Sequence, residues 1–499
     1  MRLLRRSLMI AVLAAGLVPS AAFAQSADIP IMPLSDVKPG MHGVGYSVFS
    51  GTEPEAFDFV VRGIVPDYQI NKVEVWPWVI TVQLSGGPKR SDGSMLFDKN
   101  LIYAGMSGSP MFIDGKLIGG LMASQDFNTA AQAAVTPIEL QAGLIALDHP
   151  GETHPLTVRP GEYVATCFVY GDADSCAQST VTAPYHEHLL TTSHSLDGMP
   201  YGLIKLPVFI LPVADLTESQ QGASKQGGKV GRPVGTAVVH GMFGMVVREG
   251  PLPETVPVEF TAAGIYERPQ VLHYHMAYHK TATGALNNVL NTALARLPID
   301  QAFAGLEVTI RLAQPAGTIR YRDNAVAALG AMEYLLDSLI DQEQESLRID
   351  GIDIAYRRLP SRDLWSPLAV QIQGAKPDGK VTFLARRSRD NAVEQATKVL
   401  DTSVLRAHRP TPTWMDGTNA QGEILKVMSV RDALPLLAKI EDRDALYYIS
   451  IEKDEQLDID AKASGDVRRK PKVEILLTLA GGEKRFNATA EAKVRTLQK

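Results

Sequence analysis

Short β-strand patterns separated by turn residues fill the first part of the chain and limit the folds open to it. Alternating or β-branched segments run over residues 73–75, 78–84 and 163–170, with clusters of Gly, Pro, Asp and Asn between them. Strands at this spacing are typical of β-barrels and β-sandwiches. The same criteria predict a short helix over 136–144 and a polar loop from Thr217 to Pro233.

The length and composition indicate several folded domains. A chain of 499 residues exceeds one ordinary domain of about 100–200 residues. Hydrophobic residues make up 45% and charged residues 21%, which is the balance of a globular protein and excludes extensive disorder.

The first 24 residues read as a secretory signal peptide. Arg2, Arg5 and Arg6 precede an apolar run, and the small-x-small sequence that ends at Ala24 predicts cleavage there. We therefore expect a periplasmic or secreted protein. Arg5 and Arg6 also resemble part of a twin-arginine signal, so the export route stays open.

The charge and hydropathy exclude two classes of partner. Loss of the three signal-peptide arginines changes the formal net charge from −6 to −9, which argues against nucleic acid or anionic lipid as a ligand. No later run approaches the ~18 apolar residues that cross a bilayer, so no transmembrane segment is expected after signal removal.

The only cysteines, Cys167 and Cys176, stand close together. In an oxidising compartment this spacing predicts one disulfide that closes a hairpin, with two free thiols as the alternative. Two cysteines alone cannot form a structural zinc site.

Residues 105–110, Gly-Met-Ser-Gly-Ser-Pro, carry the strongest chemical signal. A serine between glycines on a sharp turn can expose its hydroxyl, and the N–H groups of Gly105 and Ser107 can converge on an oxyanion. The segment therefore predicts acyl transfer through Ser107. A purely structural turn is the alternative, since small residues and proline are ordinary turn residues.

The segments around this turn resemble the SpoIVB sporulation serine peptidase family. They are the entry PLSDVKPGMHGVGYSVFSGT at 33–52, the serine turn at 105–110, DGKLIGG at 114–120 and VTPIE at 135–139. The resemblance covers roughly residues 30–260 and implies a chymotrypsin-like double β-barrel with serine endopeptidase activity on a peptide or protein substrate.

A serine nucleophile needs a base, and His194 is the first candidate. It follows an apolar strand and enters a Gly/Pro loop, where a scaffold can aim a side chain. The family histidine stands in a Gly-His-Pro-like turn and precedes the serine, whereas His194 is flanked by serines and follows Ser107. That order corresponds to a circular permutation of the two half-barrels. His240 is the second candidate.

The acid member of a triad is predicted at Asp92, roughly where the family acid precedes its serine. Asp98 and Asp197 are the alternatives. His273, His275 and His279 have a spacing that could bind Zn²⁺ or Cu²⁺, but they lack nearby carboxylate or cysteine ligands in the sequence. We expect neither a metal nor another cofactor.

The resemblance fades beyond residue 260. Strand patterns and a helix that is capped by residues 323–325 and runs to about Leu339 predict a β-rich accessory domain with one helix over 261–400, and an α+β region follows over 401–499. With the signal peptide and the peptidase-like domain at 25–260, these regions account for the whole chain.

Two functions of different classes follow from the sequence. The first is an exported serine endopeptidase of restricted specificity, whose accessory domains recognise substrate or tether a protein partner. The second is a non-catalytic periplasmic binding or scaffold protein that retains the peptidase-like fold.

Overall fold

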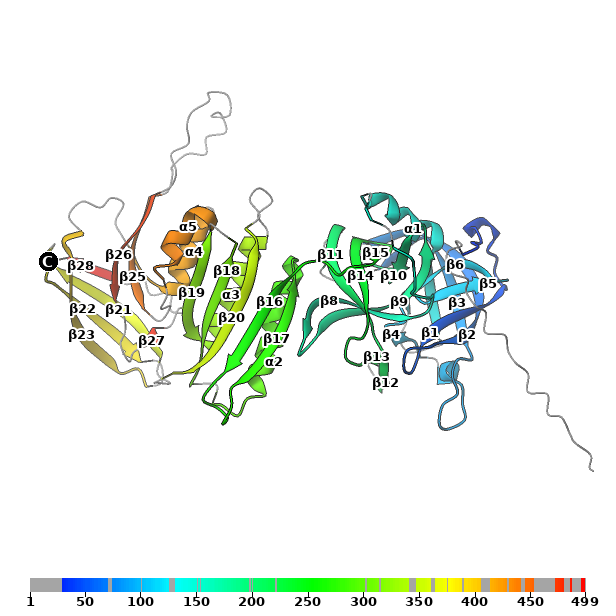
Figure 1. Ribbon diagram of the computed structural model, residues 1–499, viewed down its shortest axis with the longest axis horizontal. Helices are drawn as coiled ribbons and strands as arrows, with labels where there is room; N and C mark the ends of the chain where they lie inside the picture. The colour runs from blue at the N-terminus through cyan, green and yellow to red at the C-terminus, as the bar shows by residue number, and fades with distance from the viewer. Residues whose placement is uncertain are drawn as a thin grey trace, which may run out of the picture.

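The computed structural model shows an elongated, mainly β molecule whose elements follow one another from the N-terminal barrel to the C-terminal sheets (Figure 1). It describes residues 29–499 except for 71–73, 100, 125–130, 150, 153, 197–198, 200, 220–221, 301–302, 314–315, 341–346, 360–363, 375, 388–389, 405–412, 429, 441–444, 453–471, 480–484, 487–494 and 499. The predicted signal peptide and its cleavage site at Ala24 lie outside the described residues.

A closed antiparallel barrel forms the N-terminal part of the molecule. Its strands are β1 (His42–Val48), β2 (Pro54–Ile70), β3 (Glu74–Ser85), β5 (Pro110–Ile113), β6 (Lys116–Ser124) and β7 (Gln132–Pro137). They pair in the order β1-β2-β3-β7-β6-β5, and β5 returns to β1. Phe57, Phe59, Val82 and Met111 lie in its core. The short helix α1 (Ile138–Ala142) follows β7 directly and confirms the helix predicted there.

A second set of six strands also pairs in a ring. They are β8 (Tyr163–Gly171), β9 (Ser175–Tyr185), β10 (His188–Thr191), β11 (Gly202–Ile210), β14 (Pro233–Gly241) and β15 (Gly244–Glu249). The order is β8-β9-β10-β15-β14-β11, and β11 returns to β8. Numbered along the chain within each ring, both rings have the strand order 1-2-3-6-5-4, although the sequence shows no internal repeat.

The predicted loop from Thr217 to Pro233 is wrong over its first half. The chain there forms the hairpin of β12 (Val213–Ser219) and β13 (Gly222–Gly227). β13 also pairs in parallel with the two-residue strand β4 (Tyr103–Ala104), which leads into the serine turn. The hairpin has polar residues on its exposed positions, and this composition is what made it resemble a loop.

A larger sheet extends from the second ring. β17 (Gln270–Ala277) pairs with β8, and the sheet continues through β16 (Thr255–Ala262), β20 (Ile349–Arg358), β18 (Ala304–Leu312) and β19 (Gly317–Asn324). The predicted domain boundary at residue 260 falls inside β16.

Two helices pack with this sheet around one apolar core. They are α2 (Lys280–Ala295), which the sequence did not predict, and α3 (Ala325–Ile340), which it did. Asn324 Oδ1 accepts the Ala327 N–H at 3.1 Å, so Asn324 caps α3 as expected.

The C-terminal region contains two small sheets and two helices (Figure 1). One sheet holds β21 (Leu364–Gln373), β22 (Gly379–Arg387), β23 (Val393–Leu400), β27 (Arg485–Phe486) and β28 (Arg495–Gln498). The other holds β24 (Thr413–Asp416), β25 (Leu446–Glu452) and β26 (Lys472–Leu479), beside α4 (Gly417–Val427) and α5 (Val430–Leu437). Throughout the described residues, no helix is both long and apolar enough to cross a membrane.

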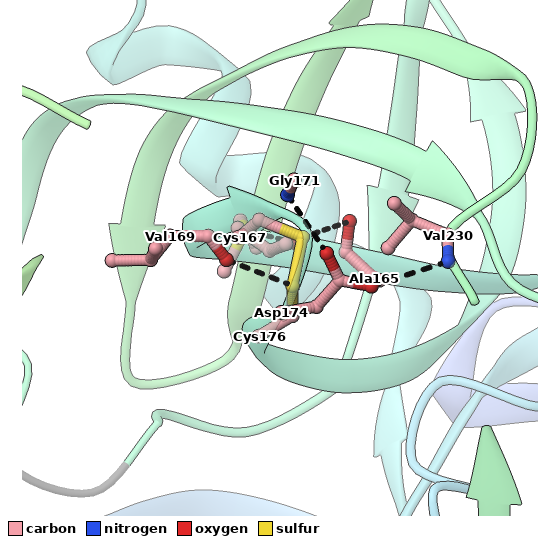
Figure 2. The surroundings of a disulfide bond; sticks show 9 residues. Ala165, Cys167, Val169, Gly171, Asp174, Cys176 and Val230 are labelled. Atoms are coloured by element: carbon pink, nitrogen blue, oxygen red, sulfur yellow. Dashed lines mark hydrogen bonds between the residues drawn. A yellow bond between two sulfur atoms is a disulfide. The ribbon is translucent and has the colours of Figure 1, made fainter. Parts of the chain in front are cut away.

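The predicted disulfide is confirmed. Cys167 and Cys176 face each other across β8 and β9 and are bonded, as Figure 2 shows. Beside it, the Asp174 carboxylate accepts the N–H groups of Gly171 at 3.1 Å and Val230 at 3.4 Å. The bond therefore closes the β8–β9 hairpin next to a loop tied by hydrogen bonds.

Candidate active site

Ser107 lies on a tight turn between β4 and β5. Gly105 and Gly108 on either side both have φ of +93°, a conformation that disfavours other residues. A Cβ on Gly108 would lie 2.0 Å from the Thr180 carbonyl oxygen, and one on Gly105 would lie 2.4 Å from the Tyr163 hydroxyl. Both positions therefore require glycine, which explains the spacing seen in the sequence.

Neighbouring strands fix the backbone of this serine turn. Thr180 of β9 donates its N–H to the Ser107 carbonyl at 2.7 Å and its hydroxyl to the Gly105 carbonyl at 2.9 Å. The Gly108 N–H donates to the Leu121 carbonyl of β6 at 2.7 Å. Among the described residues, the Ser107 N–H meets no acceptor. It is therefore available to bind an oxyanion.

His194 lies against the serine, as the sequence predicts for a base. Its Nε2 is 2.7 Å from Ser107 Oγ, and its Nδ1 is 2.5 Å from the Ser195 carbonyl oxygen. A carbonyl can only accept, so Nδ1 carries a proton, and in the neutral imidazole the Nε2 lone pair then faces the Ser107 hydroxyl. The Met122 carbonyl, the other acceptor near Ser107 Oγ, is farther away at 3.2 Å.

The two residues before His194 adopt an unusual backbone conformation. Thr192 has φ of +78° and Ser193 has φ of +69°, which is rare for a β-branched residue such as threonine. Buried polar side chains hold them: Gln141 Nε2 donates to Ser193 Oγ and Thr136 Oγ1 donates to the Ser193 carbonyl, each at 2.6 Å. The scaffold thus forces the direction in which His194 projects.

Thr182 and Gly120 link this histidine turn to the serine turn. The Thr182 hydroxyl donates to the Gly108 carbonyl at 2.8 Å and lies 3.5 Å from Ser193 Oγ. A Cβ on Gly120 would lie only 2.0 Å from the same Ser193 oxygen. The two turns are therefore packed against each other through a buried polar network that the sequence did not reveal.

His240, the second candidate for the base, lies beside the segment that follows His194. It is fully buried, and its Nε2 accepts the Leu196 N–H at 2.8 Å. Its ring also packs against Tyr201, with the ring centroids 5.6 Å apart. His240 therefore positions the chain that follows His194, and the imidazole at Ser107 Oγ is that of His194.

Asp92 does not reach the imidazole. It accepts the Ser94 N–H at 3.0 Å and the Ser94 hydroxyl at 2.6 Å, with Lys99 Nζ 3.8 Å away. The hydrogen bonds from Ser94 lower the pKa of this exposed carboxyl. The alternative Asp98 accepts the Met95 N–H at 2.8 Å within the same region. His194 Nδ1 contacts the Ser195 carbonyl.

Asp197, the third candidate for the acid, lies outside the described residues.

The three histidines that could bind a metal by their spacing each contact a different neighbour. His273 lies 4.0 Å from a Glu259 oxygen, His275 stacks on Tyr170, and His279 accepts the Thr281 N–H at the start of α2. Burial, and then the nearby charge of His240, lower the pKa of His279. In the described part of the chain, no group of three or more potential ligands is placed to hold a metal ion.

Comparisons with protein-family models, curated proteins and solved structures found no match for this chain.

Proposed function

We propose that the protein is an exported serine endopeptidase of the SpoIVB type that cleaves peptide bonds through an acyl-enzyme on Ser107. The observation that carries the proposal is the 2.7 Å contact between Ser107 Oγ and His194 Nε2, with the Ser195 carbonyl at Nδ1. A hydroxyl within hydrogen-bond distance of a neutral imidazole nitrogen is the arrangement that base-activated serine nucleophiles share.

The geometry assigns a role to each group. His194 Nε2 takes the Ser107 proton as Oγ attacks the peptide carbonyl carbon, and the N–H groups of Gly105 and Ser107 stabilise the oxyanion. The imidazolium then gives its proton to the leaving amine as the C–N bond breaks. Water, deprotonated by the same nitrogen, attacks the ester carbonyl, and the proton returns to Ser107 Oγ as the acid leaves.

The Ser195 carbonyl contributes to the orientation of the imidazole. By accepting from Nδ1, it holds the tautomer of His194 whose Nε2 can take the Ser107 proton. We expect restricted specificity for a peptide or protein substrate, and not digestive activity.

The strand pairing supports the chymotrypsin-like double barrel that the resemblance implies. Two six-membered rings with one strand order are present, and the serine belongs to the first ring and the histidine to the second. The circular permutation expected from the sequence is compatible with this arrangement. Triads are defined by geometry and not by chain order.

Export is part of the proposal. The Cys167–Cys176 disulfide forms readily in an oxidising compartment, and the predicted signal peptide would direct the chain to the periplasm or the exterior. The domains beyond residue 260 would then bind substrate or tether a protein partner.

Labelling with a fluorophosphonate probe tests the proposal. We expect the wild-type protein to be phosphonylated at Ser107, as located by mass spectrometry, and Ser107→Ala and His194→Gln to lose the label. Ser94→Ala, a change in an exposed loop, should label as the wild type does. If folded wild-type protein takes up no label, the endopeptidase proposal fails and the non-catalytic binding or scaffold protein replaces it.

A further inference from the structure

The β12–β13 hairpin reaches from the second ring to the strand that leads into the serine turn. β13 pairs with β4, and Glu218 of β12 accepts from the Tyr103 hydroxyl of β4. Arg90 Nη2 lies 2.6 Å from the same Glu218 oxygen. Backbone and side-chain contacts therefore hold the hairpin against β4, which directly precedes the serine turn.

Lys225 of β13 is buried behind this turn, with only 3% of its surface exposed. Its Nζ lies 4.5 Å from the centre of the Tyr163 ring and 5.5 Å from that of Phe49, and it donates to Ser47 Oγ at 2.7 Å. Within the described residues, no carboxylate lies within ion-pair distance of this amine. Burial accordingly lowers its pKa well below the ordinary value.

A buried amine without a carboxylate is costly, since neither water nor an opposite charge compensates for its desolvation. An apolar side chain of similar length would fill the same space at lower cost. The hydrogen bond to Ser47 is a contact of Lys225 that methionine at position 225 could not make.

Ser47 connects Lys225 to the serine turn. Ser47 Oγ lies 2.9 Å from Ser109 Oγ, and Ser109 Oγ donates to the Met106 carbonyl at 2.6 Å. Ser47 Oγ accepts from both Lys225 Nζ and Ser109 Oγ, and Ser109 Oγ also lies within hydrogen-bond distance of the Met106 carbonyl. Lys225 thus holds Ser47 in contact with Ser109, and Ser109 contacts the Met106 carbonyl.

The Met106 carbonyl and the Ser107 N–H belong to the same peptide unit. That unit is planar and trans, so the N–H points opposite to the carbonyl. Whatever fixes the Met106 carbonyl therefore also fixes the direction of the Ser107 N–H.

We propose that Lys225 is a positioning residue that acts through Ser47 and Ser109 to aim the Ser107 N–H at the oxyanion. The inference rests on the proposed function of Ser107, and it adds a group that no sequence motif marks. It also gives the β12–β13 hairpin a role: the hairpin places the Lys225 amine beside the residues that contact the serine turn.

The test compares Lys225→Met with the wild type and with Lys205→Met, which changes an exposed lysine on β11. Fluorophosphonate labelling is followed as a function of probe concentration. We expect the maximal labelling rate of Lys225→Met to fall by about tenfold to a hundredfold, because one oxyanion donor is misaimed. The half-saturating probe concentration and the melting temperature should not be lowered, and Lys205→Met should match the wild type.

Ser47→Ala provides the second variant. It should lower the maximal rate similarly, and adding Lys225→Met to it should cause no further loss, because both changes break the same chain. An unchanged rate in Lys225→Met overturns the proposal. So does a rate loss that accompanies general destabilisation and is independent of Ser47.

Hydrogen exchange distinguishes a failure of the Lys225 positioning role from a failure of the peptidase assignment. Amides in residues 103–113 should exchange faster in Lys225→Met than in the wild type whether or not the protein is an enzyme. If the wild type takes no label but exchange in this segment increases, only the peptidase assignment fails. If exchange in this segment is unchanged, the positioning role of Lys225 fails.

Discussion

Replacement of Gly120 by alanine should disable the candidate site without a change at either Ser107 or His194. The new Cβ would lie 2.0 Å from Ser193 Oγ, whereas real Cβ contacts essentially never fall below 3.0 Å, so the oxygen or the strand must move by about 1 Å. Ser193 directly precedes His194 and is also held by Gln141. The displacement should therefore lengthen the 2.7 Å contact between His194 and Ser107.

A displacement of about 1 Å between reacting groups costs about a hundredfold in rate. We expect Gly120→Ala to lower the fluorophosphonate labelling rate by that factor, and overpacking should destabilise the fold by about 1–3 kcal/mol. Thermal unfolding, measured in parallel, shows that the variant is folded at the assay temperature.

Gly143→Ala is the matched control for this change. Gly143 has φ of −58° at the end of α1, and a Cβ added to it would meet no atom within 4 Å. This variant should label at the wild-type rate. Wild-type labelling by folded Gly120→Ala would refute the argument that the packing of the two turns sets the distance between base and nucleophile.

Three further predictions concern groups outside this contact. Asp92→Asn should label at the wild-type rate, because Asp92 bonds to Ser94 and not to the imidazole; a large loss would contradict that placement. Replacing both Cys167 and Cys176 by alanine should reduce the free energy of unfolding in urea by about 2–3 kcal/mol, since the disulfide closes a loop with a sequence separation of 9. Labelling of the folded variant should be unchanged, and equal stability of the two proteins would refute the loop-entropy argument. The hydrogen bonds from Arg90 and Tyr103 lower the pKa of Glu218, so this carboxylate stabilises the fold above its ordinary pKa of 4.5 and loses that effect as the pH falls through its lower folded value. Glu218→Gln should therefore be less stable than the wild type at pH 7, and the difference in urea midpoint should close in acid; a constant difference would contradict the assignment.

Local patterns in the sequence predicted those parts of the fold that depend on local rules. The strand at 163–170 is rich in β-branched and aromatic residues and is largely buried, and the helix after Asn324 has both a cap and an apolar face. The glycines at 105 and 108 indicated a sharp turn, and both have positive φ. Ser107 and His194, which are in contact, were both singled out from the turn residues beside them in the sequence.

The remaining features depend on contacts between distant segments. Asp92 was predicted by its position before the serine, but its loop closes on itself through Ser94, and sequence spacing cannot show that. The β12–β13 hairpin looked like a loop because its polar residues are partly exposed. Lys225 is buried only because the hairpin folds across to Ser47, which lies far away in the chain.

The position of the site between the two rings explains why the order of its residues along the chain matters little. The serine turn precedes the fourth strand of the first ring, and the histidine turn follows the third strand of the second. A Cβ on Gly108 would collide with both the Thr180 carbonyl and the Thr192 N–H, so the serine turn is packed directly into the second ring. The reacting distance is thus determined by the packing of one ring on the other, and a change that loosens this packing should reduce reactivity even when both rings remain folded.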